Sequence, residues 1–315
     1  MSFEITSELL ANITSSIEVS NDKAIVALFE EMHYADIAEI LDELSFDNVV
    51  YIIKLLDSEK TSAVLMELDE DIREKTLQNL SAKEIAEEVE ELDSDDAADI
   101  IGELSQERQE AVLSKIEDEE HVKEIEELLA YDEDSAGGLM AKELVKVNEN
   151  WTVLKCVREM RAQAEEVTRV HSIYVVDDND KLKGRLSLKD LLITSTKTAI
   201  SEVYIPKVDF VNVHDNLDEV SNKMRKYDLE AIPVVDNDGI LLGRITIDDI
   251  VDVIKEEADK DYQLAAGLTQ DVEADDSILQ LTKARLPWLF LGLLGGVGAF
   301  LIMVLFENTF DENAV

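Results

Sequence analysis

Acidic residues recur in this chain at spacings that could bind a divalent cation. Asp95 and Asp99 are four residues apart in the run from Asp93 to Asp99, so on a helix they would share a face. Like charges placed in this way repel each other unless a cation lies between them. A divalent-cation site is one interpretation of this pattern, and a solvated acidic face is the default alternative.

A second candidate site lies in two segments that repeat at a spacing of 59 residues, 172–191 and 231–250. Each copy ends in Ser/Thr-x-x-Asp at the start of an expected helix, and the residues concerned are Ser187, Asp190, Thr246 and Asp249. The hydroxyl groups fit a helix N-cap with an acidic residue three positions later. Simple helix capping is one explanation of this motif.

Short helices are expected to position the first site. Residues 33–128 divide into eight blocks of twelve, each ending in Leu or Ile, with another apolar residue three positions earlier. That spacing places both side chains on one helical face. Six of the blocks open with a residue that can cap a helix, namely Ser45, Asp57, Asp69, Ser81, Asp93 and Ser105. Helices this short need neighbours to bury their apolar face, so we predict an α-solenoid.

The second site is expected in a tandem α/β module. In each copy a β-branched run meets an Asp/Asn turn, and a second strand led by Gly-Arg follows. The preceding segments, around Thr152–Arg161 and Leu217–Lys226, have apolar residues at helical spacing. Two α/β repeats in tandem are therefore predicted.

A membrane helix is predicted at Leu286–Phe306, a run of twenty-one residues without a charge. Lys283 and Arg285 precede the run and acidic residues follow it, so the positive-inside tendency leaves the N-terminal region in the cytoplasm. A buried core helix is the alternative, although core helices rarely have so long an apolar run.

The composition excludes several classes of function. With 72 acidic and 29 basic residues the net charge is −43, so nucleic acid is not an expected partner. Bound cations would relieve the self-repulsion, although solubility or a salt-adapted host would also explain the acidity. Cys156 is the single cysteine, so no disulfide can form within the chain. The four histidines are scattered, and no P-loop, nucleophile elbow or H-E-x-x-H motif occurs, so we do not expect an enzyme.

The tandem repeat resembles the cystathionine β-synthase (CBS) domain pair. The resemblance is carried by Gly-x-x-Ser/Thr-x-x-Asp, present as Gly184, Ser187 and Asp190 and again as Gly243, Thr246 and Asp249. It implies a regulatory module that often binds an adenine nucleotide such as ATP, with the Ser/Thr and Asp side chains contacting phosphate and ribose. Many such pairs bind no nucleotide, so simple helix capping and ligand binding are equally compatible with the sequence.

The order of the parts resembles the MgtE family of magnesium channels and transporters. Tyr227–Val235 and residues 247–268 match that family best, and the second segment ends in what the family uses as a plug helix. The expected fold class is multidomain, an all-α solenoid followed by an α/β CBS pair, a long connecting helix and one transmembrane helix. The expected boundaries are solenoid 1–131, CBS repeats 132–195 and 196–254, plug helix 255–282, transmembrane helix 283–307 and tail 308–315.

The resemblance implies a homodimer, formed through the CBS pair and the membrane region, in the cell membrane with its N-terminal region in the cytoplasm. Mg²⁺ bound between the domains would stabilise a closed pore, and several weak sites would make the response steep. The implied metal ligands are Asp95, Asp99, Asp228, Asp249, Asp252, Glu257 and Asp261. Lys260 stands where the family commonly has a carboxylate, which should weaken one site. Asp249 is implied in both nucleotide and metal binding.

One departure from the family opens other hypotheses. The family's transport domain has five membrane helices per subunit, whereas this sequence has one, so we expect either a fragment of a transporter or a short form without transport. The leading hypothesis is a Mg²⁺-sensing regulatory region. The alternatives are a membrane-tethered adenine-nucleotide sensor that controls a partner, and a solenoid scaffold. Acids clustered in residues 248–261 favour cation gating over the scaffold.

Overall fold

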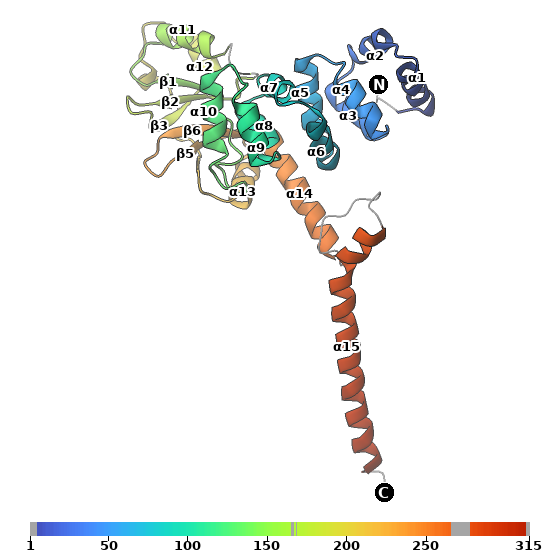
Figure 1. Cartoon of the computed structure of the whole chain (residues 1–315). Helices are drawn as coiled ribbons and strands as arrows, with labels where there is room; N and C mark the ends of the chain where they lie inside the picture. Colours follow the sequence, from blue (N-terminus) through green and yellow to red (C-terminus); the bar gives the residue numbers. More distant parts are fainter. Residues whose placement is uncertain (1–4, 165–166, 168, 266–277, 313–315) are drawn as a thin grey trace. The chain divides into compact units, whose positions relative to one another are not determined.

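The computed structural model describes residues 5–164, 167, 169–265 and 278–312 (Figure 1). The chain forms two compact units, residues 1–247 and 248–315. Within its described residues, the first unit consists of a series of short helices followed by two small sheets with their own helices. The expected fold class, helical solenoid, then α/β pair, then apolar helix, is confirmed.

The predicted twelve-residue repeat folds as a series of short helices. Their bounds are α1 Ser7–Glu18, α2 Asp22–Phe29, α3 Tyr34–Asp42, α4 Phe46–Ile53, α5 Ser58–Glu67, α6 Glu70–Asn79, α7 Ala82–Val89, α8 Ser94–Gly102, α9 Gln106–Leu113 and α10 Glu119–Leu128. Helices α3 to α10 correspond to the eight blocks. Helix α3 packs on α5, α5 on α7 and α7 on α9, while α4 packs on α6 and α8 on α10. The helices therefore stack in two alternating rows, as in a solenoid.

The core of the stack contains the apolar residues that lie three positions before the end of each twelve-residue block. Seven of these eight side chains are at most 2% exposed, namely Leu41, Ile53, Leu65, Leu77, Val89, Ile101 and Ile125. All six expected caps occupy the N-cap position. Only Asp57 and Ser81 make the side-chain cap bond, at 3.0 and 3.3 Å from the backbone nitrogens of Lys60 and Glu84. The sequence predicted where these helices start, but it did not predict which N-cap side chains form the capping hydrogen bond.

Glu88, on α7, is a partly buried carboxylate inside the stack. Burial, and then the charges of Glu87 and Glu91, raise its pKa to about 8. Its Oε2 has no hydrogen-bond partner among the described residues. The folded state keeps the Glu88 carboxyl group protonated above its ordinary pKa, whereas the unfolded state releases this proton. The free energy of unfolding therefore falls as pH rises from about 5 to about 8.

We therefore expect Glu88→Gln to raise the free energy of unfolding at pH 8 by on the order of 2 kcal/mol, and to flatten its fall between about pH 5 and pH 8. Urea unfolding at a series of pH values measures both effects. Glu126→Gln removes an exposed carboxylate of α10 and is the matched control, which should change neither. Parallel profiles for the wild type and Glu88→Gln would contradict the prediction.

The two repeats fold into two sheets of the same topology. The first contains β1 Val145–Asn148, α11 Val153–Gln163, β2 Ile173–Val176, β3 Leu182–Leu186 and α12 Leu188–Ile193, and the second contains β4 Val211–Asn212, α13 Leu217–Tyr227, β5 Ala231–Val235 and β6 Leu241–Thr246. A 3₁₀ turn, η1 Ile200–Glu202, lies between them. In each sheet the first two strands are parallel and the last two antiparallel. Both sheets have a register shift at the same place, after Val175 and after Val234.

The Gly-Arg pairs mark where another segment crosses each sheet. Arg185 exchanges two backbone hydrogen bonds with Ile205, at 3.0 and 2.9 Å, and Arg244 does so with Ala141, at 2.9 and 2.8 Å. A Cβ on Gly184 would lie 2.2 Å from the carbonyl oxygen of Ile205, and one on Gly243 would lie 2.6 Å from that of Ala141. Glycine is therefore required because a backbone passes too close for any side chain.

The second unit contains α14 Ile247–Ala265 and α15 Ile278–Glu312. Within α15, Thr282–Val304 has a mean hydropathy of 2.1 and is long and apolar enough to cross a membrane. This helix fits the predicted transmembrane helix and begins before the predicted apolar run. Pro287 lies within it.

Candidate metal-binding site

Glu143 lies between α10 and β1, and its carboxylate holds the start of α8. The backbone nitrogen and hydroxyl of Ser94 donate to its two carboxylate oxygens at 3.0 and 2.9 Å. Ser94 is fully buried, and its Oγ also accepts a bond from the backbone nitrogen of Lys142 at 2.9 Å. A carboxylate at a helix N-terminus satisfies an orphan N–H group and interacts favourably with the helix dipole. Glu143 thus supplies from outside the helix a cap that Asp93 does not make.

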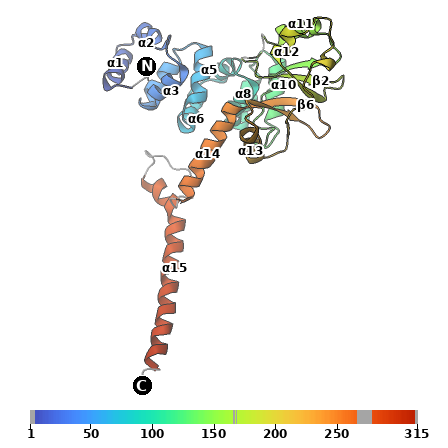
Figure 2. The same ribbon diagram turned by 180° about the vertical axis from the view of Figure 1, so that it is seen from behind.

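Arg244, on β6, attaches the second sheet to the same helix. Its Nε donates to the carbonyl oxygen of Glu143 at 2.6 Å, and its Nη2 lies 3.2 Å from Oδ2 of Asp93. The Arg244 side chain is 8% exposed, so leaving its charge unpaired would be costly. We call Asp93, Ser94, Glu143 and Arg244 the junction. Helices α8 and α10 lie beside the sheets, whereas α1 to α4 lie at the other end of the helical array (Figures 1 and 2).

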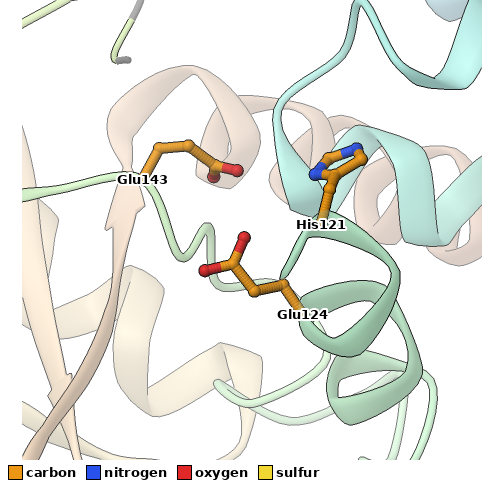
Figure 3. Close-up of side chains that lie close together, drawn as sticks. All are labelled: His121, Glu124 and Glu143. Carbon is orange, nitrogen blue, oxygen red and sulfur yellow. The ribbon is translucent and has the colours of Figure 1, made fainter. Parts of the chain in front are cut away.

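Two groups of possible metal ligands share Glu143. In the Asp93 group, donor atoms of Asp93, Asp95 and Glu143 all lie within 4.8 Å of one another. In the His121 group, donor atoms of His121, Glu124 and Glu143 do so. Every member is half-buried. Figure 3 shows the carboxylates of Glu124 and Glu143 pointing toward each other with the His121 ring beside them.

Negative charge is concentrated around the His121 group. Burial, and then the charges of Glu143 and Glu120, raise the pKa of Glu124 to about 7. Lys142 opposes this shift, but its Nζ is 3.0 Å from a carboxylate oxygen of Glu127, with which it forms an ion pair. A cation bound here would relieve the repulsion between Glu124 and Glu143.

The predicted metal ligands lie in several places. Asp95 belongs to the Asp93 group, and within the described residues no other predicted metal ligand belongs to such a group. Asp99 is exposed one turn further along α8, and Asp228 is exposed at the left-handed C-cap of α13, with φ of 51°. Asp249 and Asp252 lie on α14 of the second unit. The side chains of Glu257 and Asp261 lie outside the described residues.

The predicted nucleotide-binding residues lie at the ends of β3 and β6. Ser187 is the N-cap residue of α12 but makes no capping hydrogen bond, and Asp190 lies in the first turn of that helix. Thr246 is buried at the end of β6, and Asp249 lies in the first turn of α14. Ser187 therefore occupies the predicted N-cap position, but its hydroxyl group makes no capping hydrogen bond.

Glu143, Arg244, His121 and Glu124 were not predicted as site residues from the sequence. The repeated Gly-Arg pair was the available signal for Arg244, but its counterpart Arg185 is exposed, so the motif alone does not identify the buried one. His121 and Glu124 are three apart on α10, a spacing compatible with a shared ligand. Glu143 carries no local signal, because its partners are 49 residues away in sequence.

Comparison with known families matches most of the first unit. Residues 32–134 match the MgtE intracellular N domain. Residues 136–195 and 200–256 each match the CBS domain.

Curated relatives and a solved structure agree with these matches. The magnesium transporters MgtE of Thermus thermophilus and Enterococcus faecalis are 38% and 34% identical to this chain over 58% and 59% of its length. The chain spans 41% of the length of each, about two fifths. The crystal structure of the cytosolic domain of the Mg²⁺ channel MgtE in complex with ATP has a TM-score of 0.72 and 33% identity, and the match covers 78% of this chain and 100% of that one. These relatives are named as transporters rather than enzymes.

Proposed function

From the premise that this chain is a relative of the MgtE magnesium transporters with their N domain and a CBS pair, we propose that it is the Mg²⁺-sensing regulatory region of a magnesium channel or transporter. Helix α15 would be its first membrane span, with the N-terminal unit in the cytoplasm. The observation that carries the proposal is the Asp93 group. There, acidic donors of α8 and of the segment leading into the first sheet converge within 4.8 Å.

Mg²⁺ would act by favouring a closed arrangement of these acidic parts. With a net charge of −43, the protein repels itself, and cations that bind a compact form better than an open one shift the equilibrium toward it. Mg²⁺ keeps most of its water ligands, so each ion needs few carboxylates and can be shared between domains. We assign Asp95 and Asp99 of α8, Asp228 of the second repeat, and Asp249, Asp252, Glu257 and Asp261 of α14 to this role.

The CBS pair is proposed to bind an adenine nucleotide. The half-buried Ser187, which makes no capping bond, supports this proposal, as does the ATP complex of the related cytosolic domain. The residues assigned are Ser187, Asp190, Thr246 and Asp249. A membrane-tethered nucleotide sensor without transport is the second candidate function, favoured by the same observations.

We also propose that the chain is a homodimer. On α12, Leu188, Leu192 and Ile193 are 60%, 79% and 74% exposed. Three large apolar side chains so exposed on one short helix are typical of a surface that another protein covers. A second copy of the CBS pair is the proposed partner, with the membrane region as a further contact.

Limited proteolysis of the full chain in detergent across a Mg²⁺ titration tests the proposal. We expect Mg²⁺ to slow trypsin cleavage between α10 and β1 and within α14, with no protection from a monovalent salt of the same ionic strength. Asp95→Asn and Asp252→Asn should each raise the Mg²⁺ midpoint at least about fivefold, because each removes a ligand of the closed form. Light scattering on the same sample should give twice the chain mass.

The control variant is Glu126→Gln, which removes one exposed carboxylate of α10 and should leave the midpoint unchanged. Equal protection by the monovalent salt would refute Mg²⁺ sensing and leave the acidity as solvation. Protection by ATP without Mg²⁺ would then favour the nucleotide sensor.

A further inference from the structure

The His121 group has the donor set of a transition-metal site rather than a Mg²⁺ site. It combines one imidazole with two carboxylates, and Mg²⁺ prefers oxygen ligands alone. Imidazole suits Zn²⁺ and the neighbouring first-row ions, which bind mixed nitrogen and oxygen sets. His121 and Glu124 come from one face of α10, and Glu143 comes from the segment that leads to β1 (Figure 3).

A backbone carbonyl fixes the orientation of the imidazole. Nε2 of His121 lies 3.3 Å from the carbonyl oxygen of Val89, at the end of α7. A carbonyl can only accept, so Nε2 carries the proton and Nδ1 of the neutral ring keeps its lone pair. Metal-ligating histidines commonly donate their second ring N–H to such a carbonyl, which fixes both ring and tautomer. The Val89 carbonyl is not a member of the His121 group, and its contact with Nε2 leaves Nδ1 available as a metal ligand.

The charges around Glu143 differ on its two sides. On the side of the Asp93 group, Arg244 lies 3.2 Å from Asp93 and supplies a cation from the protein itself. On the other side, no ion pair with Glu124 occurs among the described residues, and Lys142 is paired with Glu127. In the part of the chain that the structure describes, the two carboxylates of the His121 group therefore face each other without an ion-pair partner.

We propose that His121, Glu124 and Glu143 bind one divalent transition-metal ion, with Zn²⁺ as the ion to test. This site lies beside the Asp93 group and shares only Glu143 with it. Bond lengths of about 2.0–2.2 Å would need the donor atoms to close by roughly an ångström, which the torsions of two glutamate side chains can supply. Water would complete the coordination.

Such an ion would fasten α10 to the segment that leads into the first sheet. Glu143 also holds the N-terminus of α8 through Ser94, so the ion would stabilise the junction as a whole. The inference does not depend on the proposed Mg²⁺ sensing, because two of its three donors, His121 and Glu124, belong to no proposed Mg²⁺ site.

Calorimetric titration of the full chain in detergent with Zn²⁺, in millimolar Mg²⁺ at physiological ionic strength, tests the proposal. We expect one tight site per chain, and His121→Ala and Glu124→Gln should each weaken it at least about tenfold. Titration with Co²⁺ should give visible absorption bands from a mixed nitrogen and oxygen site, absent in His121→Ala. Glu124→Gln keeps the shape of the side chain, so it tests the site even if His121→Ala fails to fold.

Two matched controls distinguish this site from the acidic surface. His214→Ala removes an exposed imidazole, and Glu126→Gln removes an exposed carboxylate of α10, and neither should change Zn²⁺ affinity. Absence of a tight site, or equal losses in the controls and the site variants, would overturn the proposal. Mg²⁺ protection in His121→Ala should match the wild type, so failure of this site and failure of Mg²⁺ sensing are distinguishable.

Discussion

Arg244→Gln is expected to lower the free energy of unfolding by about 3 kcal/mol, because it breaks a buried ion pair and leaves its partners unmatched. The variant loses both the contact with Asp93 at 3.2 Å and the bond to the carbonyl oxygen of Glu143 at 2.6 Å. Urea unfolding of the full chain measures the loss. Hydrogen exchange at the amide of Ser94 should accelerate, since Glu143 would no longer be fixed in place.

The chain contains a matched control for this prediction. Arg185 occupies the same place 59 residues earlier, after a glycine in the corresponding strand, but its side chain is exposed. Arg185→Gln should therefore change the free energy of unfolding by no more than about 0.5 kcal/mol. Similar losses in the two variants would show that the ion pair at the junction is not what makes Arg244 important.

Gly184→Ala is the second substitution with a large expected effect, a loss of about 3 kcal/mol. The new Cβ would lie 2.2 Å from the carbonyl oxygen of Ile205 and 2.6 Å from a ring carbon of Tyr204. Since a backbone cannot move aside as a flexible side chain can, the two hydrogen bonds between Arg185 and Ile205 should be lost. Urea unfolding and hydrogen exchange at Ile205 measure the two effects.

Gly102→Ala is the control for the glycine prediction. Gly102 ends α8, and a Cβ there would meet only Leu129 Cδ2, at an ordinary 3.8 Å. Alanine favours the helix, so this variant should be neutral or more stable by up to about 1 kcal/mol. If Gly184→Ala were as stable as Gly102→Ala, the close approach of residue 205 would not constrain that position.

Both predictions concern contacts between residues that are far apart in the sequence. Arg244 joins a strand to a helix whose residue Asp93 lies 151 positions earlier. The junction therefore makes the orientation of the helices on the sheets depend on a few polar contacts. Such contacts are sensitive to nearby cations, because they consist of charges in a half-buried environment.

Much of the fold could be predicted because its signals are local. The twelve-residue repeat places apolar residues such as Leu65 and Ile101 on the buried face of the helices, and a Ser or Asp marks the start of six of the eight blocks. The repeat of 59 residues predicts two α/β modules, and the structure shows that they have the same topology and a register shift at the same place. These features depend on interactions within a few residues or between identical segments.

The candidate site was predictable only in part. Asp95 was singled out because it is four residues from Asp99 on one helix, yet the structure places Asp95 in a group of three donors while Asp99 is exposed. Spacing along a helix gives the face of a residue, but the burial of that face depends on what packs against it. Here the segment carrying Glu143 packs against the start of α8.

The sequence by itself determined the helices of the solenoid, the tandem sheets, the apolar helix and the strongly acidic character. The hydrophobic period, the capping residues and the net charge can be read from residues that are close in sequence. Predicting these features therefore requires no knowledge of distant contacts. Only the tertiary structure decided that Glu143 caps α8, that Arg244 rather than Arg185 is buried, and that His121 and Glu124 face Glu143. The physical reason is that desolvation and charge pairing depend on spatial neighbours, which the fold brings together from far apart in the chain.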